Sequence, residues 1–311
     1  MSFDPLHARA YATCEALARS HYENFPVASW LLPAPMRPHV AAVYAFARVA
    51  DDIADEGTVP ARERLTKLNA WQRRLHAALE VELESGTPHE HEDLIIIAIA
   101  HSILVLDLPI AWLDELISAF AQDITTTRYA SWAEVFDYCR RSANPVGRLV
   151  LRIAGYRDEW LDRSSDAVCT ALQLTNFWQD FGRDWQAGRL YVPREVLEAC
   201  GADERELAAG PPRELSRAWQ EALARCVAVT DEQFGRGRGV CDGVAGRLRY
   251  ELRLTWLGGR RILGRVDEAR ANLLDYRPTL GARDVPAILW RAAVWKMANR
   301  WSVSGTSVAS V

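Results

Sequence analysis

The sequence has no close pair of cysteines, no excess of positive charge and no hydrophobic run long enough to span a membrane. Its six cysteines are scattered along 311 residues and no positively charged, apolar leader opens the chain, so we expect a reduced, cytoplasmic protein. Its 37 basic residues are outnumbered by 41 acids, and the net charge of −4 argues against nucleic-acid binding. The most apolar stretch has 13 uncharged residues between Asp93 and Asp107. That is about 20 Å of helix against roughly 30 Å of hydrocarbon, so we expect a buried helix.

Sustained alternation of apolar and polar residues is also missing, as is a Gly-x-Gly-x-x-Gly turn, which excludes a Rossmann nucleotide site. Hydrophobic residues make up 49% of the chain, enough for a large core. Proline and glycine fall at helix ends, so we predict an all-α helical bundle with a single domain over residues 1–311. The expected helices begin at Pro5 and at a Ser131/Glu134 capping box, and otherwise cover 38–57, 60–86, 92–106, 109–126, 145–155, 165–187, 193–199, 212–233, 243–266 and 284–301.

The helix expected over residues 38–57 carries a polar stripe. Tyr44, Arg48, Asp51 and Asp55 stand at i, i+4, i+7 and i+11 and therefore share one face. Two carboxylates one turn apart repel each other unless a cation lies between them, and Mg²⁺ is usually held by one or two carboxylates together with phosphate and water. The alternative is a solvated acidic helix end.

A second acidic helix is expected over residues 165–187. Asn176, Asp180 and Asp184 repeat the one-turn spacing, with Gln173 on the preceding turn. Most of the remaining surface is apolar, so this helix should be largely buried, with its bulky residues at Leu172, Leu174, Phe177, Trp178, Phe181 and Trp185. Burying carboxylates without a counter-ion costs several kcal/mol, which favours a bound cation.

In a helical bundle the two acidic segments can face each other across a cavity. Two or three Mg²⁺ ions between them would clamp a diphosphate, with arginines completing the clamp. Such a site suits the ionisation of an allylic or cyclopropylcarbinyl diphosphate, because the ions neutralise the leaving group and an apolar cavity shelters the carbocation.

Four segments together resemble the squalene/phytoene synthase family. They are residues 21–29 (HYENFPVAS), 44–55 (YAFARVADDIAD), 176–184 (NFWQDFGRD) and 188–193 (GRLYVP). The resemblance spans roughly residues 15 to 280, and two Asp-x-x-x-Asp pairs in this context are a specific signal. Residues 21–28 and 142–147 (SANPVG) look most like the hydroxysqualene synthases of bacterial hopanoid biosynthesis.

The resemblance implies an isoprenoid-synthase fold in which Asp51, Asp55, Asp180 and Asp184 bind Mg²⁺ and Asn176 lies nearby as a ligand or hydrogen-bond partner. It also implies a set of substrate contacts: Phe25, Tyr44, Arg48, Gln173, Asn176, Arg189, Tyr191 and Arg277. In this branch presqualene diphosphate loses pyrophosphate and is captured by water, giving hydroxysqualene. The implied partners are a presqualene diphosphate synthase that hands over the substrate and a flavin-dependent reductase that takes the product.

One departure from the family bears on the reaction. Many members read Tyr-Cys-x-Tyr where this chain has Tyr138-Cys-Arg-Arg141, so the second tyrosine, implicated in farnesyl condensation, is an arginine. Gly259 similarly stands where relatives commonly carry a tyrosine. The alternative function is a head-to-head condensing synthase that makes presqualene diphosphate, squalene or phytoene. A catalytically inactive assembly factor is disfavoured because all four aspartates are retained.

Water capture requires a polar group near the cation, and we nominate Asn144. Its alternative role is the N-cap of the helix that Pro145 opens. Phe25 or Trp178 could stabilise the cation through its ring face, and the alternative for each is core packing.

Two further patterns remain. Residues 236–300 carry 13 arginines and Lys296 against 6 acids, interleaved with tryptophan and leucine. This segment either docks on anionic lipid at the inner membrane or forms an ordinary arginine-rich surface over the cavity. His89-Glu-His91-Glu-Asp93 looks like a metal site but is expected to be a solvated loop.

Overall fold

The computed structural model describes residues 4–20, 31–55, 57–80, 90–209 and 214–295. The chain divides into two compact units, one made of Met1–Thr126 and Asp137–Cys169 and the other of Thr127–Phe136 and Thr170–Val311. Two helices, α6 (Trp132–Ser142) and α8 (Glu159–Gln179), each belong partly to one unit and partly to the other. The expectation of a single domain stays a prediction.

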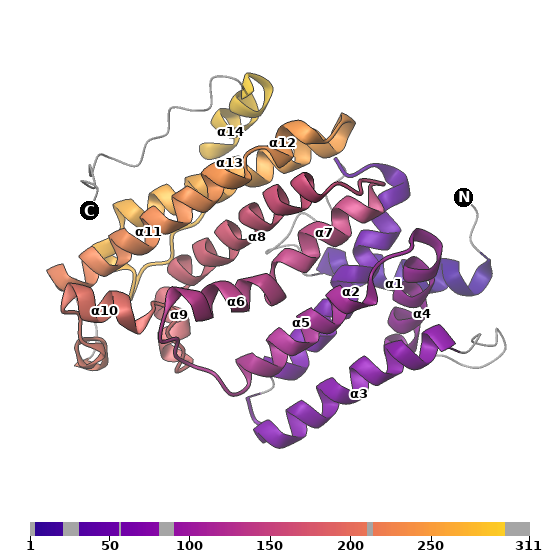
Figure 1. Cartoon of the computed structure of the whole chain (residues 1–311), viewed down its shortest axis with the longest axis horizontal. Helices are drawn as coiled ribbons and strands as arrows, with labels where there is room; N and C mark the ends of the chain where they lie inside the picture. The colour runs from indigo at the N-terminus through magenta and orange to yellow at the C-terminus, as the bar shows by residue number, and fades with distance from the viewer. Residues whose placement is uncertain (1–3, 21–30, 56, 81–89, 210–213, 296–311) are drawn as a thin grey trace. The chain divides into compact units, whose positions relative to one another are not determined.

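The first unit is built around α2, whose apolar side is made of small and branched residues such as Val40, Val43, Ala50 and Ala54. This side is buried where α1 and α4 pack against α2 and against each other (Figure 1). The other helices of the unit complete its core. The complete helices of this unit are α1 (Pro5–Ser20), the 3-10 turn η2 (Ala34–Met36), α2 (Arg37–Asp55), α3 (Ala61–Glu80), α4 (His91–Leu106), α5 (Ile110–Asp123) and α7 (Asn144–Ile153).

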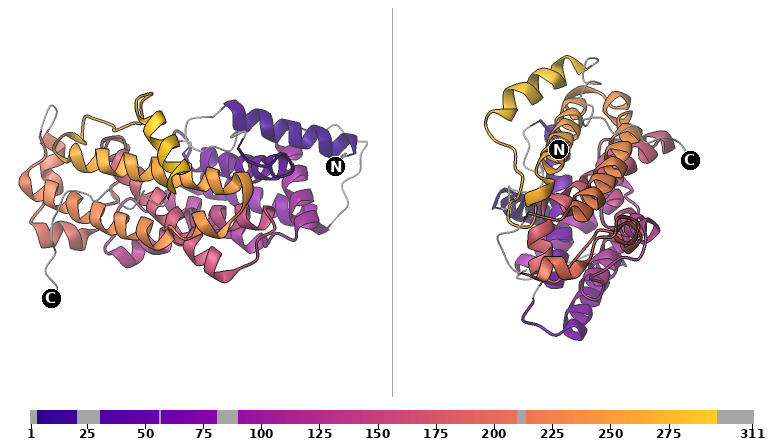
Figure 2. Two further views of the ribbon diagram at one scale, coloured as in Figure 1. Left: turned by 90° about the horizontal axis from the view of Figure 1, so that it is seen from above. Right: turned by 90° about the vertical axis from the view of Figure 1, so that its left-hand side faces the viewer.

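The second unit is built around two long helices, α11 and α13, which run alongside each other (Figure 2). Trp256 of α13 is buried and donates from its indole nitrogen to the carbonyl of Phe234 on α11, 2.9 Å away. The complete helices of this unit are α9 (Phe181–Gln186), α10 (Arg194–Cys200), η3 (Glu204–Ala209), α11 (Arg217–Gly237), α12 (Val240–Gly243), α13 (Gly246–Glu268), η4 (Arg270–Asn272) and α14 (Asp284–Ala293).

The all-α prediction is confirmed: among the residues that the structure describes there are helices and turns, with one isolated parallel bridge between Arg128 and Leu190 and no strand. The apolar segment 94–106 lies in α4, and its part from Leu94 to Ala100 is buried as expected, whereas Leu104 and Val105 are exposed. None of the helices in the described ranges is long and apolar enough to cross a membrane.

Several local expectations were wrong. The helix expected over 284–301 ends at Ala293. The helix expected over 165–187 begins earlier, at Glu159, and ends at Gln179, with α9 starting at Phe181. Glu134 does not reach back to Ser131. It accepts from the backbone N–H of Ala130, 2.6 Å away, while Glu195 accepts the N–H of Trp132 at the same distance. A long-range side chain therefore caps α6, which a local motif cannot indicate.

Candidate active site

The first acidic pair lies on the last two turns of α2. Asp51 and Asp55 are one turn apart, Asp55 is exposed and the Asp51 side chain is 41% exposed. The opposite side of α2 is buried, because alanines at 41, 42, 45, 50 and 54 let its neighbours approach closely. The predicted stripe from Tyr44 to Asp55 is therefore the polar side of a helix whose other side is core.

Arg48 is engaged within the same helix. Its Nη2 lies 2.6 Å from Asp52 and its Nη1 lies 3.6 Å from Asp51. Burial disfavours the charged form of Arg48, but the hydrogen bond and charge of Asp52 outweigh this, and the pKa of Arg48 is raised. Burial also raises the pKa of Tyr44, with the charge of Arg48 opposing it. Sequence analysis missed Asp52 as the main partner of Arg48. The i, i+4 spacing of the two residues could have indicated this pair.

The second acidic pair lies where α8 gives way to α9. Asp180 separates the two helices with φ −93° and ψ 12°. Its backbone N–H nevertheless donates to the carbonyl of Asn176 at 2.8 Å, and its carbonyl accepts from the backbone N–H of Asp184 at 2.9 Å. The hydrogen-bond ladder therefore continues through the irregular residue, and Asn176, Asp180 and Asp184 stay one turn apart. Asn176 is exposed, Gln173 is half-buried, and the apolar residues Leu174, Phe177, Trp178 and Phe181 are buried as expected.

Arg277 binds Asp180 through two nitrogens. Its Nη2 lies 3.0 Å from Oδ2 while its Nε donates to Oδ1, and the Asp180 side chain is 25% exposed. Arg183 is a more distant neighbour at 3.7 Å. The carboxylate thus already has a cationic partner, which weakens the argument that its burial alone requires a metal ion. Arg277 was expected at a diphosphate, and the structure places it on an aspartate of the acidic pair.

Gly182 explains how Arg277 reaches this position. The backbone of residues 273–274 lies directly on α9, and a Cβ on Gly182 would come within 2.7 Å of the carbonyl carbon of Leu274. Only a residue without a side chain permits that approach. Three residues later the chain presents Arg277 to Asp180, so the glycine between the two aspartates helps to position their arginine.

Arg189 and Tyr191 follow α9 in a segment held by its own backbone. The N–H of Arg189 donates to the Asp184 carbonyl at 2.7 Å, and its Nε lies 3.7 Å from the Asp184 carboxylate. Tyr191 is buried and stacks on Phe177 with ring centres 3.7 Å apart. Tyr129 also stacks on Tyr191, with ring centres 5.7 Å apart. Sequence analysis missed Tyr129, which carries no local motif.

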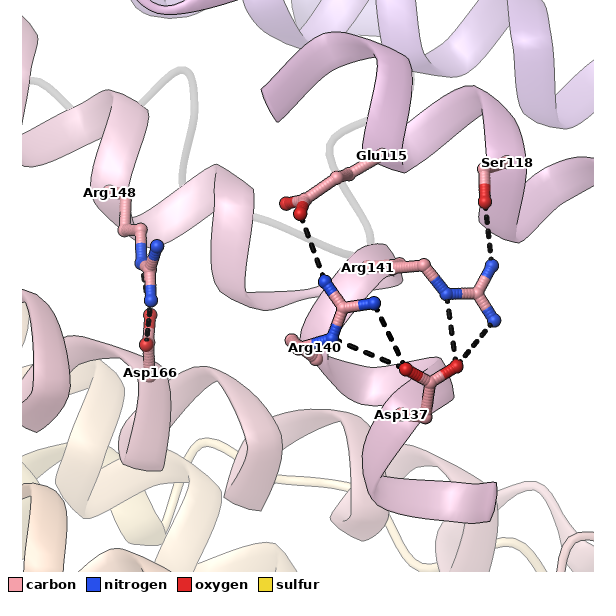
Figure 3. Close-up of polar contacts among 7 residues, drawn as sticks. All are labelled: Glu115, Ser118, Asp137, Arg140, Arg141, Arg148 and Asp166. Atoms are coloured by element: carbon pink, nitrogen blue, oxygen red, sulfur yellow. Dashed lines mark hydrogen bonds and ion pairs between the residues drawn. The ribbon is translucent and has the colours of Figure 1, made fainter. Parts of the chain in front are cut away.

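Arg141 is held by a polar network between α5 and α6 (Figure 3). Its guanidinium donates to Asp137 at 2.9 and 3.2 Å, to Ser118 at 2.7 Å and to Gln122. Burial acts to raise the pKa of Asp137, but the hydrogen bonds from Arg140 and Arg141 outweigh it and lower that pKa. Arg141 is therefore a fixed cation.

Asn144 is the first residue of α7 and is 8% exposed. The N-cap position is occupied by Ala143, so the alternative role of Asn144 as N-cap is wrong. Gly147, one turn later, faces α8 so closely that a Cβ would lie 2.5 Å from the Cys169 sulfur. Asn144 therefore begins a tightly packed helix pair, and its role in orienting water stays a prediction.

The remaining nominated residues are easily placed. Trp178 is 1% exposed and donates from its indole nitrogen to Thr230 at 2.8 Å, as expected for a packing residue. Phe25 and His89 lie outside the described residues. His91 and Asp93 were expected in a solvated loop, and this was wrong. They form the first turn of α4, where Asp93 accepts from the N–H of Glu90 in a capping box.

The carboxylates fit the ligand chemistry of Mg²⁺. No group of three or more His, Cys, Asp or Glu in the described part of the chain could hold a metal ion unaided. Mg²⁺ does not require such a group, since one or two carboxylates, substrate phosphates and water complete its shell. Asp51 with Asp55, and Asp180 with Asp184, each offer two hard oxygen donors one turn apart on a partly exposed helix side.

Comparison with known proteins gives one consistent result. A squalene/phytoene synthase family model matches residues 18–284. A hydroxysqualene synthase of Sinorhizobium fredii is 38% identical over 236 residues, 74% of each chain. A phytoene synthase of Mycobacterium tuberculosis is 32% identical over 193 residues, 62% of this chain and 60% of the other. The crystal structure of squalene synthase HpnC from Alicyclobacillus acidocaldarius superposes with a TM-score of 0.76 at 37% identity, covering 86% of this chain and 96% of that one.

Proposed function

The chain belongs to the squalene/phytoene synthase family, whose enzymes act on prenyl diphosphates, and we propose that it is a hydroxysqualene synthase. The reaction converts presqualene diphosphate and water into hydroxysqualene and pyrophosphate. The observation that carries this choice is the 38% identity to a hydroxysqualene synthase, against 32% for a phytoene synthase. The arginine at position 141, where condensing relatives have a tyrosine, points the same way.

We further propose that Asp51, Asp55, Asp180 and Asp184 hold Mg²⁺, with Asn176 beside the second pair. Bound Mg²⁺ would supply positive charge that stabilises the departing pyrophosphate. The chain adds fixed cations of its own. Arg48, Arg189 and Arg277 each stand beside one of these aspartates and can donate charge-assisted hydrogen bonds to diphosphate oxygens.

Arg277 is prepared for this role by its partner. Asp180 fixes the guanidinium in one orientation before substrate arrives, so little side-chain freedom is lost on binding. Tyr191, immobilised against Phe177, holds the backbone that carries Arg189. Asn144 is proposed to orient the water that captures the carbocation. Its amide can accept or donate a hydrogen bond and is a poor nucleophile.

The second candidate is a condensing synthase. It is favoured by the 37% identity to a protein described as a squalene synthase. In the first candidate the enzyme receives its substrate from a presqualene diphosphate synthase and passes the alcohol to a flavin-dependent reductase. In the second it needs farnesyl or geranylgeranyl diphosphate, together with a nicotinamide hydride donor where the product is squalene.

A product assay separates the two. The purified chain is incubated with Mg²⁺ and presqualene diphosphate in a first tube, farnesyl diphosphate with a nicotinamide hydride donor in a second, and geranylgeranyl diphosphate in a third. The products are analysed by mass spectrometry. A C30 alcohol from the first tube and no C30 product from the second is the expected result. Presqualene diphosphate or squalene formed from farnesyl diphosphate overturns the choice of branch, and phytoene from geranylgeranyl diphosphate does the same. Full turnover in the presence of excess chelator would contradict the proposed dependence on Mg²⁺.

A further inference from the structure

Large apolar side chains are exposed mainly in one segment of the second unit. Across the described residues nine such side chains are exposed, and five of them fall within residues 276–290. Those five are Tyr276, Leu280, Val285, Leu289 and Trp290. Isolated exposed apolar residues are normal in folded proteins, but this concentration in fifteen residues calls for an explanation.

The last three of these residues form the outer side of α14. The inner side is apolar too: Ile288 and Ala292 are buried, and α14 packs against α13 (Figure 2). A surface helix normally has polar residues on the side away from the core. Here that side consists of Val285, Pro286, Leu289, Trp290 and Ala293, all exposed and none able to form a side-chain hydrogen bond except through the Trp290 indole.

The N-terminal end of α14 is fixed by Asp284, which is 7% exposed. Its carboxylate accepts from Arg261 at 3.0 Å and from the N–H of Gly281 at 2.7 Å, and it pairs with Arg265 at 2.7 Å. The hydrogen bond from Gly281 is the main cause of a lowered Asp284 pKa, so the group is charged at neutral pH. A buried carboxylate with these partners prevents this end from turning.

The C-terminal end is fixed by Trp295. Arg238 donates to the Trp295 carbonyl at 3.1 Å, and both Arg238 and Arg253 lie over its ring at 4.6 and 5.0 Å. The ring also meets Trp256 edge-on at 5.3 Å. Contacts therefore hold α14 at both ends, with Leu289 and Trp290 exposed between them. The structure holds these side chains outward.

The surroundings of this side are basic. Between residues 244 and 295 the sequence has ten arginines against five acids. Arg283 is exposed at the start of α14. Arg291 is half-buried on α14, and burial together with the charges of Arg261 and Arg260 lowers its pKa, so cationic groups lie on this side of the unit. An outward apolar side edged by arginines is the pattern of a helix that lies in the surface of an anionic bilayer.

We propose that the outer side of α14 docks on the surface of an anionic phospholipid bilayer, with Leu289 and Trp290 entering the boundary between headgroups and acyl chains. A second copy of the chain is a poorer occupant, because a two-fold interface would bring the same basic surroundings face to face. The docking segment continues directly from Arg277, which contacts Asp180 of the candidate active site. Docking would therefore hold that part of the site close to a lipid phase.

The test is vesicle flotation with the full chain. Vesicles of phosphatidylcholine alone are compared with vesicles that also contain phosphatidylglycerol, at low and at high salt. We expect binding to the anionic vesicles only, weakened by salt. Leu289→Ser with Trp290→Ser should reduce that binding by at least about tenfold, because the inserted apolar area is lost.

The matched control is Leu104→Ser with Val105→Ser on α4, where a neighbouring apolar pair is 66% and 53% exposed. It should bind like the parent. Equal loss in both variants, no binding by the parent, or equal binding to neutral vesicles would each overturn the proposal. So would a parent that sediments as a dimer and becomes monomeric on Leu289→Ser with Trp290→Ser. The assay needs no turnover, so its failure leaves the proposed activity untouched.

Discussion

The two acidic pairs share a sequence spacing but are built differently. On α2 the carboxylates extend from an unbroken helix, and their arginine, Arg48, comes from the same helix. At the junction of α8 and α9 the helix is irregular at Asp180, and the main arginine comes from 97 residues further along the chain. The first pair is a local feature of a helix, whereas the second depends on the tertiary structure of its unit.

This difference implies different sensitivities. Changes near Asp51 should alter function and leave the fold intact, because Arg48, its ion-pair partner, is within one turn of the same helix. Changes near Asp180 should alter both, because Arg277 and the backbone beneath it depend on the same contacts. The predictions below test this distinction, beginning with the largest effect.

Replacing one carboxylate in each region should affect turnover equally and stability unequally. Asp51→Asn and Asp180→Asn should each lower kcat by about 10³-fold, comparable to the loss of one preorganised charge-stabilising group. Asp180→Asn should also lower the free energy of unfolding by about 1 kcal/mol, because Arg277 loses a bidentate partner. Steady-state kinetics and urea unfolding measure the two effects. Equal stability losses would contradict the distinction.

Gly182→Ala tests the second region without touching a charge. Its Cβ would collide with the backbone of Leu274, so we expect the free energy of unfolding to fall by about 3 kcal/mol. Displacing this backbone also moves Arg277, so KM should rise. Gly235→Ala on α11 is the control, since nothing lies within 4 Å of its Cβ position, and it should be neutral or stabilising by up to about 1 kcal/mol. Unchanged stability in Gly182→Ala would show that the backbone yields easily.

Sequence analysis could predict the first region almost completely. The period of α2, its buried alanines and the one-turn spacing of Arg48, Asp51 and Asp55 all follow from local rules. In the second region it predicted the polar stripe but not the break at Asp180, because the i to i−4 hydrogen bonds continue through it. Neither Gly182 nor Glu195 has a local signal for what it contacts.

Acid should distinguish the two regions because all seven histidines precede residue 102. His39 on α2 is buried, with Ser102 at 2.9 Å and Tyr11 at 3.1 Å, and burial together with His101 lowers the pKa of His39 to about 4. In the unfolded chain His39 titrates near 6.5. As pH falls below about 6.5 the unfolded state binds the proton first, so stability should decline, by about 2 kcal/mol at pH 5 and by about 3 kcal/mol at pH 4.

Hydrogen exchange at pH 7.5 and pH 5 measures this effect by region. Protection should fall in α1, α2 and α4 and change little in α11 and α13, which contain no histidine. His39→Gln keeps a hydrogen-bonding side chain but removes this titration, and should flatten the pH dependence of stability. A parental pH dependence in that variant would assign the acid sensitivity to other groups.

The smallest effect is expected from Asp52→Asn, which tests how the local arginine is used. Asp52 holds Arg48 at 2.6 Å, nearer than Asp51 at 3.6 Å, and is itself outside the predicted stripe. If Arg48 turns from Asp52 to the diphosphate on binding, weakening the Arg48–Asp52 pair should lower KM about threefold, a gain in binding free energy of less than about 1 kcal/mol. The values of kcat and of the free energy of unfolding should stay unchanged. A rise in KM would mean that Asp52 itself serves the substrate site. The polar side of α2 would then be wider than the stripe that its spacing predicts, and the first region would depend on more than one turn-spaced pair.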